Sequence, residues 1–271
     1  MLFRTYKPGP PLSDFVEALW SFEGYDAPHL RERVLPQGSM DLVINLRDDR
    51  LRTYESNSPY TARTFRGCLV SGARSEFVII EKPSTLMAGV SFKPGGAFPF
   101  FNLPVGELYN QQVSLDDLWG SAANDLRDQL LEVQTPEARF LILERTLIAR
   151  AIRPLAPNQA VAFALRQFEN LSPMRTIGGV TGELGLSPRR FIQVFNDAVG
   201  LTPKLFCRIR RFQGVLRSIS TGKSIDWPAL AVDCGYFDQA HFIHDFKAFS
   251  GLSPTTYAAN RTEQQNHVPL I

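Results

Sequence analysis

The sequence predicts an α+β protein: a β-barrel domain followed by two helices, then an all-α domain of two similar helical units joined by a long helix. Three observations predict this class: alternating strand patterns before residue 114, amphipathic helical patterns after it, and an internal repeat beyond residue 158. The chain has 271 residues, of which 44% are hydrophobic and 21% are charged. This length and composition suit two globular domains of ordinary size.

Composition also limits the setting in which the protein works. No apolar run approaches the roughly 20 residues that span a bilayer, and the N-terminal segment lacks the apolar stretch of a signal peptide. The three cysteines, Cys68, Cys207 and Cys234, lie far apart without a CxxC pair, which favours neither a disulfide framework nor a zinc site. We therefore expect a cytoplasmic protein with no membrane partner, no metal and no other cofactor.

The first 113 residues have the pattern of short strands. Residues 85–92 and 41–46 alternate between apolar and polar positions, which is the period of half-buried strands. Apolar runs at 68–70 and 77–80 predict two more strands, separated by turn residues. In the strand at 85–92, one face carries Leu86, Ala88, Val90 and Phe92. In the strand at 41–46, one face carries Leu42, Ile44 and Leu46. Several short strands with frequent turns are typical of a barrel or a sandwich.

Two helices are expected next. The first begins after Ser114, and the second begins at Pro136 with Thr135 as its N-cap. The apolar stripe of the first helix is Leu115, Leu118, Trp119, Ala122, Leu126 and Leu130, and that of the second is Ala138, Leu141, Ile142, Ile148 and Ile152. These helices would pack as a hairpin or pair with a second subunit. Two prolines place a linker at 153–158, which divides the chain into domains 1–152 and 159–260 and a tail, 261–271.

The C-terminal domain contains a repeat. Residues 177–185 match 227–235 at an offset of 50, and residues 191–203 match 242–254 at an offset of 51. Each copy is a short helix, a glycine turn, a second helix with Phe at i and i+4, and a closing Gly-Leu-(Thr/Ser)-Pro. This order predicts two helix-turn-helix units. An apolar stripe at 203–219 predicts one long helix between them, about 26 Å in length, which suits two recognition helices spaced about one DNA turn apart.

The second helix of each unit carries side chains that suit nucleic acid. After Ser187 and Asp238, which are expected as N-caps, the phenylalanines point into the core and polar residues occupy the other faces. Arg, Gln and His hydrogen-bond base edges, and residues 155–260 hold 11 Lys or Arg against 7 Asp or Glu. The candidate DNA-binding residues are Arg189, Arg190, Gln193, Gln239, Ala240, His241, His244 and Lys247.

The second copy reads AVDCGYFDQAHF from residue 231 and GLSP from residue 251. It resembles the signature of the arabinose-regulator (AraC/XylS) family of bacterial transcription factors. The first copy departs further, with Thr181 where a small alanine is usual, and His244 stands where the family often has Arg. The resemblance implies that each recognition helix enters a major groove. The residues that would then face the bases are Arg189 and Gln193 in the first unit, and Gln239, Ala240, His241 and His244 in the second.

Residues 1–150 are similar to the cupin-like barrel domains found in some family members, at LPQG from residue 35 and FKPGGA from residue 92. The resemblance implies that this domain senses a small molecule or mediates dimerisation. For a ligand we expect an apolar pocket within residues 1–113, lined by side chains that include Trp20, Phe92 and Phe98; the alternative is a barrel filled by its own side chains. The expected partners are double-stranded promoter DNA, a small organic effector, RNA polymerase if the protein is an activator, and a second copy of the chain.

Two other classes of protein fit the sequence less well. A metal-dependent barrel-fold enzyme needs several converging ligands, and residues 1–113 contain one histidine, His29. A DNA-repair protein that carries a helix-turn-helix module would need a metal-bound cysteine cluster, and Cys68 stands alone. The sequence therefore favours a transcription regulator with no catalytic residues.

Overall fold

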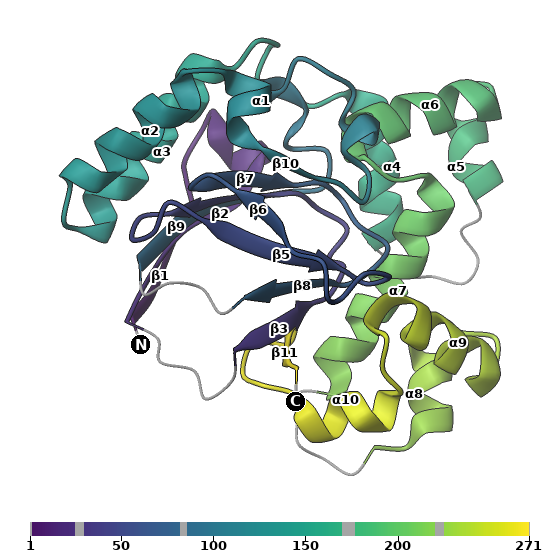
Figure 1. The fold of residues 1–271 in the computed structure, drawn as a ribbon. Helices are drawn as coiled ribbons and strands as arrows, with labels where there is room; N and C mark the ends of the chain where they lie inside the picture. Colours follow the sequence, from purple (N-terminus) through teal and green to yellow (C-terminus); the bar gives the residue numbers. More distant parts are fainter. Residues whose placement is uncertain (1, 25–29, 82–85, 170–176, 220–224, 271) are drawn as a thin grey trace.

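The computed structural model describes residues 2–24, 30–81, 86–169, 177–219 and 225–270 (Figure 1). Residues His29 and Thr85 lie outside these ranges. Two antiparallel sheets are formed mainly by the N-terminal part, and helices make up most of the C-terminal part. The predicted α+β class is confirmed. None of the described helices is both long enough and apolar enough to cross a membrane.

The two sheets face each other but do not close into a cylinder (Figure 1). The six-stranded sheet has the order β1 (Leu2–Tyr6), β2 (Val16–Glu23), β9 (Leu86–Phe92), β4 (Asp41–Asn45), β7 (Cys68–Ser71) and β10 (Gln112–Ser114). The five-stranded sheet has the order β11 (His267–Pro269), β3 (Arg31–Val34), β8 (Val78–Glu81), β5 (Leu51–Glu55) and β6 (Arg63–Phe65). Among the described strands the edges of the two sheets are not paired with each other, so the expected barrel is an open pair of sheets.

Three helices follow where two were predicted, because the first is divided at Gly120 into α1 (Leu115–Trp119) and α2 (Ala122–Glu132), and the second is α3 (Pro136–Arg150). Helices α1 and α3 pack on the larger sheet, and α2 packs against both of them. Thr135 caps α3 as predicted, its Oγ1 accepting a hydrogen bond from the Ala138 N–H at 3.2 Å. The stripe predicted for α3 is wrong, because Leu141, Ile148 and Ile152 are exposed and the helix buries Phe140, Leu143 and Leu147. Arg139 is also buried and donates to the Ser21 Oγ. The apolar periodicity fails to identify the inward face of α3 because this face includes a charged residue, Arg139.

The C-terminal helices follow the predicted order. They are α4 (Gln159–Glu169), α5 (Ile177–Glu183), α6 (Pro188–Val199), α7 (Pro203–Ile219), α8 (Trp227–Asp233), α9 (Gln239–Ser250) and α10 (Pro254–Asn260). Helices α6 and α9 each end at a left-handed glycine, Gly200 and Gly251, where a side chain would be strained. The linker at 153–158 has neither helix nor strand.

The helical part packs directly on the N-terminal domain. The buried side chains of both parts form one continuous apolar cluster, and helix α6 lies against the 3₁₀ turn η3 (Val105–Leu108). From α7, the Gln213 Nε2 donates to the Pro36 carbonyl at 2.7 Å. These contacts fix the helical units relative to the N-terminal domain.

Residues 261–271, expected to be a tail, contribute strand β11 to the smaller sheet. His267 pairs with Val34, and the Val268 side chain is buried. The strand is three residues long and includes a proline, so it shows none of the alternation from which strands are predicted. The chain therefore returns to its N-terminal domain after the last helix (Figure 1).

Candidate nucleic-acid interface and ligand cavity

The first helix-turn-helix unit consists of α5, a turn at Gly185 and α6. Gly185 has a φ of +64°, and the Ser187 Oγ caps α6 by accepting from the Arg190 N–H at 3.3 Å. Phe191 and Phe195 are completely buried, as predicted. The opposite side of the helix therefore faces solvent, and it carries the exposed residues Arg189, Arg190 and Gln193.

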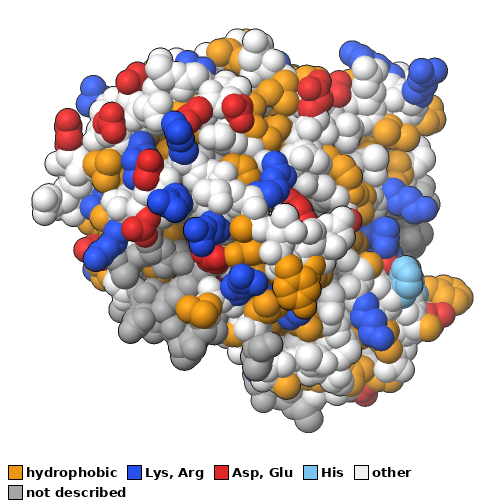
Figure 2. Space-filling model, viewed as in Figure 1, with side chains coloured by type: hydrophobic (Ala, Val, Ile, Leu, Met, Phe, Trp, Pro, Cys, Tyr) orange, Lys and Arg blue, Asp and Glu red, His pale blue; other side chains and the backbone are white. Residues whose placement is uncertain are grey.

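The second unit, α8 and α9, repeats this construction. Gly235 has a φ of +78° in the turn, and the Asp238 Oδ1 accepts from the His241 N–H at 2.7 Å. Gln239, Ala240, His244 and Lys247 are exposed. His241 is half-buried, with its ring edge-on to Tyr236 at 5.3 Å. Figure 2 shows Lys and Arg side chains distributed along the right-hand edge of the molecule, where these helical units lie.

A buried carboxylate that sequence reasoning missed joins α7 to α9. Asp245 is 1% exposed, and its Oδ1 lies 2.6 Å from the Arg208 Nη2. The Arg208 Nε donates to Oδ2 at 3.3 Å, and this pairing raises the pKa of Arg208. His241 and His244 lie 3.7 and 3.8 Å from the same carboxylate. Nothing in the local sequence distinguishes Asp245 from a surface residue, because its partner comes from another helix.

Two other polar residues of the helical units serve packing. Arg211 donates to the Gly235 carbonyl at 3.1 Å and lies over the Tyr236 ring, so it supports the second turn. Asn196, on a polar face of α6, fills the space beside Gly106 of η3, where a Cβ would overlap its side-chain amide. Asn196 thus contacts the N-terminal domain.

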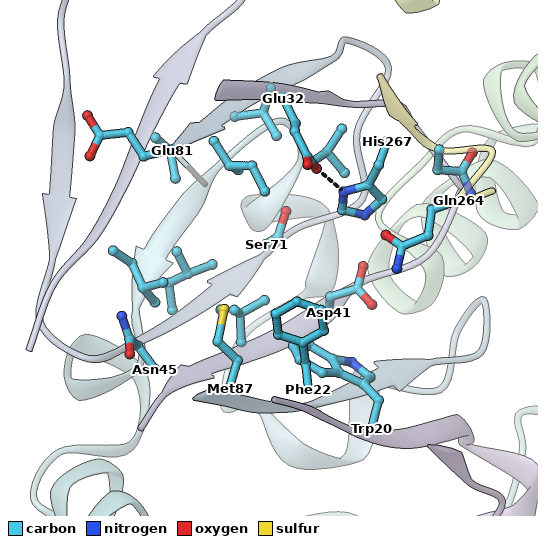
Figure 3. A pocket seen from close by; sticks show the side chains of 18 of the residues that line it. Trp20, Phe22, Glu32, Asp41, Asn45, Ser71, Glu81, Met87, Gln264 and His267 are labelled. Carbon is cyan, nitrogen blue, oxygen red and sulfur yellow. Dashed lines mark hydrogen bonds and ion pairs between the residues drawn. The ribbon is translucent and has the colours of Figure 1, made fainter. Parts of the chain in front are cut away.

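A cavity of about 1160 Å³ lies between the two sheets (Figure 3). Its floor consists of alternate residues of the larger sheet, with Trp20 and Phe22 from β2 and Met87 from β9. Figure 3 shows Glu32, Asp41, Gln264 and His267 together at one end, and the His267 Nδ1 lies 3.0 Å from the Glu32 Oε2. The cavity is thus built from the N-terminal domain and from the segment that follows α10.

The expected pocket is therefore present and larger than a filled barrel would allow. Trp20 lines it as predicted, but Phe92 and Phe98 do not. The predicted division of β4 and β9 into two faces is confirmed, and the face that carries Leu42, Val90 and Phe92 belongs to the apolar core. The opposite face lines the cavity. The pocket also extends beyond residues 1–113, because residues 262–267 line it.

Two family models match the chain. Residues 180–260 match the helix-turn-helix domain family, and residues 4–114 match a family described as a domain of unknown function (DUF6597). The C-terminal part of the chain is an AraC-type helix-turn-helix domain. No curated protein matches the sequence.

Solved structures that resemble this chain include ToxT from Vibrio cholerae, which is 8% identical with a TM-score of 0.49, over 95% of this chain and 98% of that one. ToxT with a bound unsaturated fatty acid is 12% identical, with a TM-score of 0.46 over 89% and 93% of the two chains. A probable AraC family transcriptional regulator from Rhodopseudomonas palustris is 26% identical, with a TM-score of 0.34 over 36% and 94%.

The predicted DNA-binding residues of the AraC-type domain differ in their exposure to solvent. The solvent-exposed members are Arg189, Arg190, Gln193, Gln239, Ala240, His244 and Lys247. His241 is partly covered by Tyr236, and it lies beside the buried Asp245. The contacts of these residues with DNA remain predictions.

Proposed function

We propose that this DNA-binding transcription regulator recognises promoter DNA by inserting α6 and α9 into successive major grooves. The observation that carries the proposal is the pair of helix-turn-helix units, each with a buried aromatic core and an exposed polar N-terminal half of its second helix. Helix α7 joins them with 17 residues, or about 26 Å. This length suits a spacing of about one DNA turn, roughly 34 Å.

The exposed residues suggest a division of work. Arg189 and Gln193 at the start of α6, and Gln239 at the start of α9, have donors and acceptors suited to guanine and adenine edges. Arg190 and Lys247, which are exposed, would contact phosphates, and such contacts give affinity without sequence preference. Ala240 and His244 complete the exposed face of α9. His241, which lies 3.7 Å from the Asp245 carboxylate, would act mainly by keeping this helix in place.

The test is selection of bound sites from a random duplex library with the full chain, followed by fluorescence anisotropy on the selected site. Arg189→Ala or Gln239→Ala should each cost about 1–3 kcal/mol there and relax the preference at one base pair. The matched controls are Arg145→Ala and Gln134→Ala, exposed positions in the N-terminal domain. A folded chain without salt-dependent DNA binding, or unchanged preference in both variants, would refute the proposal.

The N-terminal domain has two proposed roles. Its cavity is large enough for a small organic effector, since ligand pockets usually measure about 300–1,000 Å³. Pairing of two copies is the second role, because exposed apolar side chains occur on α2 and α3 at Leu131, Leu141 and Ile148. We propose a cytoplasmic regulator, rather than an enzyme, which contacts RNA polymerase where it activates. Sedimentation at several concentrations, with Leu141→Glu as the variant, tests the pairing.

A further inference from the structure

We propose that the cavity between the sheets binds an organic cation with an apolar body, and that its charged nitrogen lies beside Asp41. This inference rests on the cavity being an effector site, as proposed above, and specifies the chemistry of the effector. Four features of the lining carry it: the charge balance, a polar row across the larger sheet, buried polar atoms without partners, and an aromatic floor.

The charge balance of the lining favours a cation. The acidic residues among those that line the cavity are Glu32, Asp41, Asp48, Asp49, Glu81 and Glu263. The arginines among them are Arg50 and Arg52, and Arg52 lies 3.6 Å from the Glu81 carboxylate. Asp49 lies 3.3 Å from Arg127, and Glu32 lies 3.0 Å from His267, so these two acids also have partners. A cleft with low-dielectric walls and an excess of one charge concentrates ligands of the opposite charge. The carboxylate of an organic acid would be repelled by the acidic residues of the lining.

A row of polar side chains crosses the larger sheet at one end of the cavity. In the strand register, Gln112 pairs with Ser71, Ser71 with Asp41, and Asp41 with Ser91. All four residues line the cavity. Neighbouring strands lie about 4.8 Å apart, so the row presents closely spaced oxygens. It forms the polar end of an otherwise largely apolar floor.

Asp41 is the charged member of this row. The Ser91 Oγ donates to it at 2.7 Å, and no ion pair joins it among the described residues. Removal from water raises the pKa of Asp41, although the Ser91 hydrogen bond and the His267 charge oppose this shift. A hydroxyl partner compensates a carboxylate only weakly. A ligand ammonium would supply the missing positive charge and further N–H donors.

Two buried polar atoms of the lining have no hydrogen-bond partner within the described part of the chain. They are the Gln112 Oε1 and the Thr53 Oγ1, on residues that are each 2% exposed. Buried polar atoms are almost always satisfied in native proteins, so each exception requires an explanation. The Gln112 Oε1 only accepts, so its missing partner is a donor. Because this oxygen is enclosed, the Gln112 side chain must turn toward the cavity before an amine or ammonium group can provide that donor.

Behind the polar row, the floor becomes aromatic and apolar. Trp20 pairs with Gly89, and a Cβ on Gly89 would overlap the indole, so the ring lies directly over this glycine. Gly89 in turn pairs with Val43, and Phe22 with Met87. An aromatic face attracts cations and packs against flat apolar groups. The floor thus suits a ligand with a charged nitrogen at one end and an apolar body at the other.

The same end of the cavity is connected to the AraC-type domain. Gln264 and His267 lie there beside Asp41 (Figure 3), in the segment that follows α10. The neighbouring Asn266 Oδ1 accepts from the Gln213 Nε2 of α7 at 2.8 Å. A ligand nitrogen at Asp41 would therefore lie beside a segment that is hydrogen-bonded to the helix that spaces the two recognition helices. Binding and DNA affinity are expected to be linked for this reason.

The test uses the full chain and three probes with the same body: 4-phenylbutylamine, 4-phenylbutanol and 4-phenylbutanoate. Isothermal titration should give the amine a Kd at least about tenfold below those of the alcohol and the acid. Asp41→Asn should remove this preference, and Gln112→Met should weaken amine binding without increasing acid binding. Asp48→Asn, an exposed lining carboxylate outside the polar row, is the matched control and should retain it.

Equal or tighter binding of the acid, retention of the amine preference in Asp41→Asn, or no binding of any probe up to about 1 mM would each overturn the inference. Circular dichroism shows whether the Asp41→Asn chain is folded, and Gln112→Met provides a second variant. Anisotropy on the selected DNA site, measured in the same preparation, separates the two proposals. A chain that binds DNA but prefers the acid refutes only the ligand chemistry, whereas amine binding without DNA binding refutes the proposed function.

Discussion

Replacing Asp245 by Asn tests whether the buried ion pair positions the second recognition helix. The substitution keeps the shape of the side chain but removes its charge. The Asp245 side chain is 2% exposed and that of Arg208 is 31% exposed. Removing one partner of a buried pair costs about 3–5 kcal/mol. Because Arg208 stays partly hydrated and Asn still accepts one hydrogen bond, we expect a loss of about 2 kcal/mol in the free energy of unfolding.

The assay is urea unfolding followed by tryptophan fluorescence, together with anisotropy on the selected DNA site. Asp233→Asn, at an exposed position on α8, is the matched control and should stay within about 0.5 kcal/mol of the parent. Arg208→Met should cost more than Asp245→Asn, about 3 kcal/mol, because it leaves a fully buried carboxylate unpaired. The double variant should cost less than the sum of the two.

DNA affinity should fall along with stability, since the pair joins α7 to α9 and the exposed residues Gln239 and His244 lie on that helix. Two results would refute the reasoning. One is an Asp245→Asn chain that unfolds within about 0.5 kcal/mol of the parent. The other is additive costs in the double variant, which would mean that the two side chains act independently.

Three further results are expected. Gly106→Ala should destabilise the folded chain by about 1–3 kcal/mol in urea unfolding, because its Cβ overlaps the Asn196 amide, and Asn196→Ala should recover part of that loss. Lys247→Ala, at a proposed phosphate contact, should weaken binding to all duplexes alike and reduce the salt slope by about 1 in anisotropy titrations, whereas a changed site preference would contradict that contact. The raised pKa of Asp41 means that the folded state keeps this proton to higher pH than the unfolded state. This contribution to stability is therefore lost as pH rises from the ordinary Asp range through the raised pKa, and urea unfolding of Asp41→Asn over that range should lack this slope.

The sequence was most informative where a local signal had one structural meaning. The repeat identified both helix-turn-helix units, and the N-caps Ser187 and Asp238 lie where they were predicted. Phe191 and Phe242 are buried because the i, i+4 spacing places each on the inner side of a short helix. Signals of this kind depend on neighbours within the same helix, so they do not need the tertiary structure.

The sequence-based predictions are wrong where the burial of a residue depends on a partner that is distant in the sequence. Alternation separated the two faces of β4 and β9, but it could not show which face lines a cavity, because both faces are covered. The sequence therefore predicts Phe92 in the pocket, whereas the structure has it in the core. The buried face of α3 could not be recognised from its apolar residues, because it includes the charged Arg139. Asp245 looked like a surface acid until Arg208, 37 positions away, was brought beside it.

Strand β11 also sets the order in which the protein is completed during synthesis. The Glu32 and His267 side chains that meet in the smaller sheet are 235 positions apart in the chain. At roughly 5–20 residues per second, the ribosome needs about 10–50 s to make the intervening segment. During that interval the outer edge of β3 lacks its partner, and such edges pair readily with other chains. A nascent or truncated chain is therefore exposed to strand exchange with another copy until residue 269 has emerged.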